Sequence, residues 1–204
     1  GLATIASVGG AAGTLQVVDS QAGVTFTGAV DVGIVDLDAT TGTIEFSDNL
    51  TATTLTTTGD GFNLSLFGVA TTITDDTSFL NTGTLTLGNG GDTLTFVGGV
   101  DATAGNVISV GGTVNTTDTA MDFGDVSLNA ASTFDTNNAA LGTMVIGAVT
   151  TAGNRLTLDS GSTALATMDI GAIDDAAGGV IIRDAGGLAT IASVGGAAGT
   201  LQVV

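Results

Sequence analysis

The chain has 204 residues, of which 43% are apolar, and its formal net charge is −18 at pH 7. It contains no Cys, His, Lys or Tyr, so the usual general bases and activated nucleophiles are missing and we do not expect an enzyme. Its carboxylates would repel nucleic acid and anionic membrane surfaces, and no segment approaches the ~20 apolar residues that a membrane helix needs.

The first element in chain order is a segment that occurs twice. Residues 1–18 read GLATIASVGGAAGTLQVV, and residues 187–204 have the same letters. This identity predicts a tandem array with a period of 186 residues (187 minus 1): residues 1–186 form one unit, and residues 187–204 begin the next. A duplicated end segment introduced by engineering would give the same pattern. Because the chain starts without Met and neither end has a capping pattern, we expect the array to continue in both directions.

Short strands with one apolar face follow one another along the chain. The composition favours strands and turns over helices, since Gly, Thr, Val, Ile and Asp are abundant. The segments GTLQVV, GTIEF, GTLTLG and GTMVIG each place two apolar residues two positions apart, and a period of two directs both to the same side of a strand. These pairs are Leu15 and Val17, Ile44 and Phe46, Leu85 and Leu87, and Met144 and Ile146.

Gly, Asn and Asp separate the strands, as in Asn89-Gly90-Gly91-Asp92 and Asn137-Asn138. These residues tolerate the positive φ that tight corners demand. The stretch 174–179 (DDAAGG) could form a helical turn, but its two final glycines predict a corner.

A weaker internal similarity relates segments that lie 70 residues apart (83 minus 13) and predicts an ancestral duplication inside the unit. The matching segments begin at Gly13 and Gly83, at Val24 and Leu94, and at Gly42 and Gly112. All share one pattern, a Gly-containing turn followed by a short apolar–polar alternation.

These features predict an all-β fold, a parallel β-solenoid (β-helix) with short strands and Gly, Asn or Asp corners. A chain of β-sandwiches would also contain short strands, but it needs longer ones and larger core side chains, often Trp or Tyr. Only 4% of the residues are aromatic, and a solenoid interior is thin enough for small aliphatic side chains. With about 20–30 residues per coil, one unit would hold roughly six to nine coils, and the sequence does not specify their handedness.

Three carboxylate pairs are formal candidates for glycoside hydrolysis: Asp36 with Asp38, Asp75-Asp76 and Asp174-Asp175. Sugar sites normally add aromatic platforms and cations, and none lies near these pairs in the sequence. Asp is also a frequent turn residue in strand-rich sequences. We therefore assign no catalytic, cofactor-binding or metal-binding residue.

Two binding functions are alternatives to a structural one. Residues 88–94 (GNGGDTL) are similar to the Gly- and Asp-rich nonapeptide that binds Ca²⁺ in β-rolls, but such sites need consecutive copies and only one imperfect copy is present. Ice-binding solenoids present ranks of Thr-x-Thr. The candidates here are Thr51-Ala52-Thr53, Thr84-Leu85-Thr86 and Thr93-Leu94-Thr95, at uneven spacing. Thr is also favoured in strands for its β-branched side chain.

Four stretches, 24–31, 43–59, 81–99 and 112–140, resemble the β-strand repeat tracts of giant bacterial surface proteins, the filamentous-haemagglutinin and autotransporter-passenger class of adhesins and matrix fibres. The resemblance covers most of the chain. It implies a secreted fibre at the cell surface or outside the cell, acting in adhesion, as a sheath or as a biofilm scaffold. It implies no catalytic residues, and its partner would be the chain itself, in a tandem or end-to-end solenoid.

Overall fold

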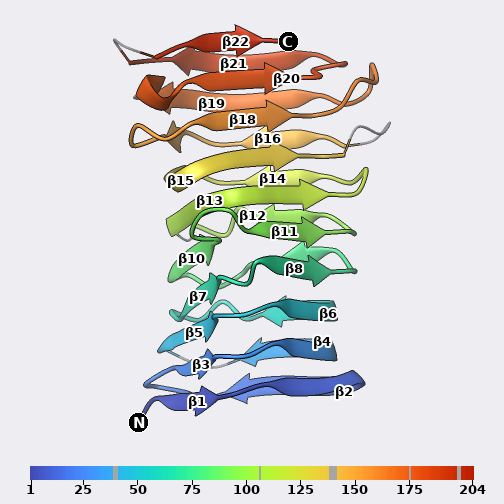
Figure 1. Ribbon diagram of the computed structural model, residues 1–204, viewed down its shortest axis with the longest axis vertical. Coiled ribbons are helices and arrows are strands. Elements are labelled where there is room, and N and C mark those ends of the chain that lie inside the picture. Colours follow the sequence, from blue (N-terminus) through green and yellow to red (C-terminus); the bar gives the residue numbers. More distant parts are fainter. Residues whose placement is uncertain (39–40, 106, 138–141, 175, 197–198) are drawn as a thin grey trace.

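The chain winds around a single axis, with its N-terminus at one end of the stack and its C-terminus at the other (Figure 1). The computed structural model describes residues 1–38, 41–105, 107–137, 142–174, 176–196 and 199–204. Every strand pairing among these residues is parallel. Paired residues lie about one coil length apart in the sequence, as in Ile108 with Val126 and Leu156 with Val180. The predicted parallel β-solenoid is confirmed, with about nine coils.

Each coil contributes strand segments to three faces, and the segments of one face pair from coil to coil. Face 1 is the column that starts at β1 and ends in β21. It comprises β1 (Ala3–Ile5), β3 (Val24–Phe26), β5 (Thr43–Phe46), β7 (Asn63–Leu66), β10 (Thr84–Leu87), the first halves of β13 (Val107–Thr116) and β15 (Val126–Asp135), β17 (Val149–Thr150), and the last residues of β19 (Met168–Asp174) and β21 (Ala189–Val194).

Faces 2 and 3 follow face 1 along each coil. Face 2 comprises the first halves of β2 (Val8–Val18), β4 (Val30–Asp38) and β6 (Leu50–Thr57), then β8 (Ala70–Ile73), β11 (Thr93–Phe96), the second halves of β13 and β15, β18 (Leu156–Asp159), β20 (Val180–Arg183) and β22 (Leu201–Val203). Face 3 comprises the second halves of β2, β4 and β6, then β9 (Thr77–Ser78), β12 (Val100–Ala102), β14 (Met121–Phe123), β16 (Met144–Ile146) and the first halves of β19 and β21.

The Thr57 side chain joins β6 to β9 on face 3. Its hydroxyl donates to the Ser78 carbonyl (3.2 Å) and accepts from the Leu80 N–H (2.7 Å). A side chain thus takes over a role that backbone groups have elsewhere in the column, because buried backbone groups need partners.

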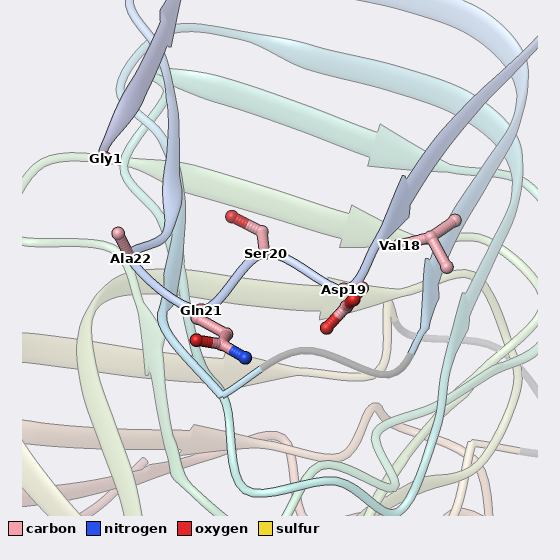
Figure 2. Close-up of a pocket in the computed structure, with 6 residues that line it drawn as sticks. All are labelled: Gly1, Val18, Asp19, Ser20, Gln21 and Ala22. Atoms are coloured by element: carbon pink, nitrogen blue, oxygen red, sulfur yellow. The ribbon is translucent and has the colours of Figure 1, made fainter.

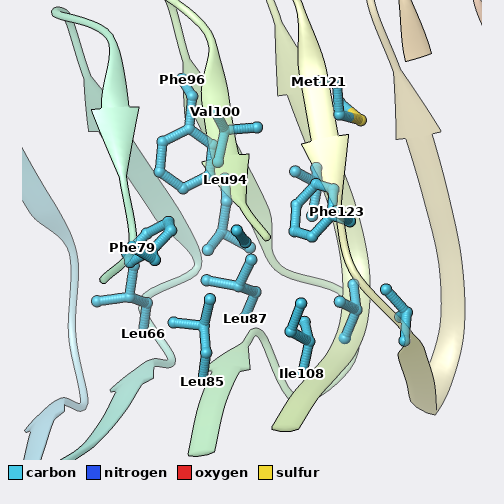
Figure 3. Packing of buried hydrophobic residues seen from close by; sticks show 14 of the residues in the cluster. Leu66, Phe79, Leu85, Leu87, Leu94, Phe96, Val100, Ile108, Met121 and Phe123 are labelled. Carbon is cyan, nitrogen blue, oxygen red and sulfur yellow. The ribbon is translucent and has the colours of Figure 1, made fainter. Parts of the chain in front are cut away.

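The interior is a continuous stack of apolar side chains (Figure 3). Of the four predicted apolar pairs, all members are buried except Leu15, which is partly buried against the same core. The predicted alternation is therefore confirmed. Seven of the eight Phe are also buried, so aromatic rings contribute more to the core than the composition suggested. Phe26 and Phe46 stack on adjacent coils of face 1, with ring centroids 4.7 Å apart.

The corners carry the positive φ values that the sequence predicts. Gly90 and Gly91 have φ of 118° and 82°, and Asn137 has φ of 63°, whereas Asn138 lies outside the described residues. In the stretch 174–179, Asp174 ends β19 and a single 3₁₀ turn, η1 (Ala176–Gly178), forms part of the corner before β20, whereas Asp175 lies outside the described residues. Within the part of the chain that the structure describes, no helix is long and apolar enough to cross a membrane.

The internal similarity between segments of one unit does not relate strands of the same face. The strand after Gly13 lies on face 3 and its match after Gly83 on face 1; the strand after Gly42 lies on face 1 and its match after Gly112 on face 2. The offset between the matching segments therefore spans three coils plus one face. The strand pattern fits any of the three faces.

Candidate functional site

The predicted carboxylate pairs lie at separate places on the surface, where they link coils. Asp36 accepts a hydrogen bond from Gln16 Nε2 (2.9 Å) and another from Thr56 Oγ1 (2.7 Å). These three side chains point outward at equivalent positions of three successive coils on face 3. Asp36 is therefore held between neighbours in the stack, and Asp38 follows it on the same outer side of β4.

The other two pairs are also remote from each other. Asp75 and Asp76 form the exposed corner between β8 and β9, where Asp75 accepts from Thr54 Oγ1 (2.7 Å). Asp174 lies at the end of β19 and accepts from the Thr151 N–H (3.2 Å), and Asp175 lies outside the described residues. Among the members of these pairs that the structure describes, no two pairs are brought together into one site.

In residues 88–94, a corner closed by Asp92 leads into Thr93 and Leu94, which begin β11. This side chain is only 5% exposed, and its Oδ2 accepts from the Asn89 N–H at 2.8 Å. Its carbonyl accepts from the Thr113 N–H on the next coil (2.7 Å). The aspartate thus acts as a turn residue, as its position after two glycines predicts. Among the described residues, no group of three or more acidic side chains is placed to hold a metal ion.

The three Thr-x-Thr segments do not line up into one rank. Residues 84–86 lie on face 1, between a coil that carries Asn63 and Ser65 and one that carries Val107 and Ser109. Residues 51–53 and 93–95 both begin on face 2, two coils apart and in shifted register: Thr51 and Thr95 share one column with Thr72 between them, whereas Thr93 pairs with Ala70. The flat, regular Thr array that motivated the ice-binding alternative is therefore not formed by these segments.

Aspartates stack on two faces of the solenoid, a feature that the sequence reasoning missed. On face 3, Asp101 and Asp122 are paired residues of adjacent coils. Burial raises the pKa of Asp122, and the charges of Asp101 and Asp76 raise it further. The spacing of Asp101 and Asp122 in the sequence equals one coil length. It predicts that they stack only when the length of that coil is already known.

The second stack lies on face 2 and ends on a cation. Asp135, Asp159 and Arg183 occupy one column on three successive coils. Burial and the Asp135 charge raise the pKa of Asp159, whereas the Gly161 N–H and Arg183 oppose that rise. Asp159 is only 7% exposed, so its negative charge is unfavourable in the folded state, and the positive charge of Arg183 offsets this only in part.

Replacing Asp122 with Asn should stabilise the fold at pH 7. A carboxyl with a raised pKa in the folded state favours folding when protonated, and that contribution is lost as pH rises through the raised value. The wild-type chain should therefore gain stability as pH falls from 7 towards 3.8, the usual pKa of Asp. Asp122→Asn should raise the free energy of unfolding by about 0.2–1 kcal/mol at pH 7, since it removes a like-charge cross-strand pair, and should flatten this pH dependence.

Urea unfolding at a series of pH values checks this expectation. Asp31→Asn is the matched control, because Asp31 is an exposed outward aspartate whose partner on the next coil is Thr51. Equal effects of the two substitutions would show that total charge, and not stacking, sets the pH dependence.

A shallow recess of about 610 Å³ lies at the corner between β2 and β3 (Figure 2). Its lining is Gly1, Val18, Asp19, Ser20, Gln21 and Ala22. Asp19 is the only acidic side chain among these residues, and the recess offers neither a His nor a second carboxylate to act with it. The arrangement therefore lacks the paired groups that acid–base or nucleophilic catalysis uses.

Comparisons of the chain with protein-family models, with curated proteins and with solved structures find no match. Its function is therefore inferred from the architecture and the surface described above.

Proposed function

We propose that this chain is a structural, non-catalytic repeat of a secreted bacterial fibre, which serves as a sheath, a biofilm scaffold or an adhesin stalk at the cell surface. The observation that carries the proposal is a continuous parallel stack combined with a segment that occurs identically at residues 1–18 and 187–204. A stack of this kind extends by adding further coils, each of which pairs with the one before.

Four properties of the chain support a mechanical role. Backbone hydrogen bonds run from coil to coil along the axis, and an apolar core follows them through the stack. Outward side chains such as Gln16, Asp36 and Thr56 add hydrogen bonds in the same direction. The net charge of −18 opposes lateral clumping of such fibres.

The proposal predicts rods whose length grows with the number of units. Chains of two, four and six units should appear as unbranched rods by electron microscopy. Each unit should add about 40 Å, because the whole chain, which is slightly longer than one unit, holds about nine coils that stack at about 4.8 Å. The rods should also resist a non-tryptic protease, since the described strands leave few unpaired stretches.

A matched chain with Leu64→Asp and Leu85→Asp in every unit provides the control. Both side chains are fully buried and paired on face 1, so this chain should lose the rods and the resistance together. Flexible strings of separate globules, or a length that does not scale with unit number, would overturn the proposal.

A further inference from the structure

The same repeated segment occupies different faces at the two ends of the chain. Ala3 lies on face 1, whereas its counterpart Ala189 pairs with the face 3 column. Val8 lies on face 2, and its counterpart Val194 lies on face 1. The identical sequence is thus placed one face earlier in the second copy.

The third strand segment of the repeat shifts in the same way. Leu15 lies on face 3 and its counterpart Leu201 on face 2. Counting along the columns, Ala3 is on face 1 of the first coil and Ala189 is on face 3 of the ninth. One full period of the sequence therefore spans eight coils and two further faces, which is eight and two-thirds coils.

The side of the strand that points inward is preserved although the face changes. In the first copy Ile5 pairs with Phe26, and in the second its counterpart Ile191 pairs with Ile170; both partners are buried. The alternation of the strand thus fits either face. The same tolerance holds inside the unit, where the internal similarity also shifts strands by one face.

Together, the two copies show both sides of a junction between units. The second copy shows which coil lies before the repeated segment, and the first shows which coil follows it. Four apolar columns continue through this junction: Ile170, Ile191 and then Phe26; Ile173, Val194 and then Val30; Val180, Leu201 and then Val35; Ile182, Val203 and then Leu37.

A recess at the second copy matches this continuation. It measures about 190 Å³, and its lining includes Ala176, Val194 and Leu201. In the first copy, β4 pairs with the equivalent positions. Gly33 of β4 lies so close to them that an added Cβ would be 3.2 Å from the carbonyl oxygen of Gly13, the counterpart of Gly199 in the recess. In a tandem array, β4 of the following unit would fill this recess.

We propose that successive units form one continuous solenoid in which each unit is turned by one third of a coil relative to the unit before it. Each surface feature then recurs on all three sides of the fibre and returns to its first face every three units. The axial rise is about 42 Å per unit and about 125 Å per three units at a coil spacing of about 4.8 Å. This inference rests on the proposed fibre function.

The aspartate stacks show what the rotation does to the surface. In an unrotated array, Asp101 and Asp122 of every unit would form one acidic stripe along face 3. With the rotation, the stripe appears on each face in turn. The charged stacks are thereby distributed over all three sides of the fibre.

Site-specific cross-linking in a chain of two units tests the rotation, because the natural sequence has no Cys. Asp169 of the first unit pairs with Thr190, which is the second unit's copy of Thr4, and Thr4 pairs with Thr25 on the next coil. Asp169→Cys in the first unit and Thr25→Cys in the second would therefore both lie on face 3 of the first unit, with Thr190 between them. They would then be about 10 Å apart, two coil spacings, within reach of a short bis-maleimide. We expect this pair to cross-link most of the chain.

The matched control places the first cysteine at Asp174, which is exposed on face 1, and keeps Thr25→Cys in the second unit. We expect this pair not to cross-link. Cross-linking of the Asp174 pair with none for the Asp169 pair would overturn the rotation while leaving a continuous fibre.

A pair within one unit separates that failure from failure of the fibre itself. Asp122→Cys and Asp169→Cys lie two coils apart on face 3, with Val145 between them, and should cross-link in any folded unit. If this pair reacts and neither pair across the junction does, the units do not stack. The proposed fibre then fails together with its symmetry.

Discussion

Phe46→Ala is expected to lower the free energy of unfolding by about 3–5 kcal/mol, as truncation of a buried Phe does in a close-packed core. Phe46 is fully buried, stacks on Phe26 with an interplanar angle of 9°, and pairs with Leu66 on the following coil. The cavity would interrupt the apolar column on two sides at once. A thin core has few other side chains that can move in to fill it. Urea unfolding followed by circular dichroism measures the loss.

The effect should remain local to the mutated coil and its neighbours. Around Phe46 each coil pairs with the coils directly beside it, so amide protons of β3, β5 and β7 should lose protection while those of the distant β20 keep theirs. Val69→Ala is the control, because Val69 is 70% exposed and its truncation should change stability by less than about 0.5 kcal/mol. Protection lost equally in β3 and β20 would contradict a stack of nearest-neighbour coils.

The sequence predicted the direction of side chains well, because alternation is a local property. Leu85 and Leu87 point inward and Thr86 points outward whatever the rest of the chain does. The corner at Asn89-Gly90-Gly91-Asp92 is equally local, since its glycines supply the positive φ. Both features follow from a few neighbouring residues.

The face on which a strand lies could not be predicted in this way. It depends on the combined length of all preceding corners, and that length varies: Ile108 pairs with Val126, whereas Leu156 pairs with the more distant Val180. A small error in any corner moves every later strand. For this reason the stacking of Asp101 on Asp122, and the rotation between the two copies of the repeat, became visible only in the structure.

Gly88→Ala is expected to cost at least ~2–4 kcal/mol, because it combines two penalties at one position. Gly88 has a φ of 74°, which disfavours a residue with a Cβ. That Cβ would also lie 2.0 Å from the Gly111 carbonyl oxygen on the next coil, and backbone cannot move aside as a side chain can. The neighbouring coils would have to separate at this corner. Unfolding in urea and hydrogen exchange at β10 and β13 measure the cost.

Three further glycines separate the two penalties. Gly91→Ala tests positive φ alone, since φ is 82° and its Cβ would meet nothing within 4 Å; we expect a cost of about 1–2 kcal/mol. Gly111→Ala tests crowding alone, because its Cβ would displace the Asn129 amide, which donates to the Gly88 carbonyl (3.1 Å). Losing that hydrogen bond should cost about 0.5–1.5 kcal/mol.

Gly61→Ala carries neither penalty, since its φ is not positive and its Cβ would have open space. This substitution should be neutral or stabilise by up to about 1 kcal/mol, because it restricts the unfolded chain. If the corners hold the coil spacing, Gly88→Ala must cost more than Gly91→Ala, since both require positive φ and only Gly88 faces backbone on the next coil. Equal costs would mean that the coils adjust their spacing freely, and the close approach at Gly88 would then add nothing to the stability of the stack.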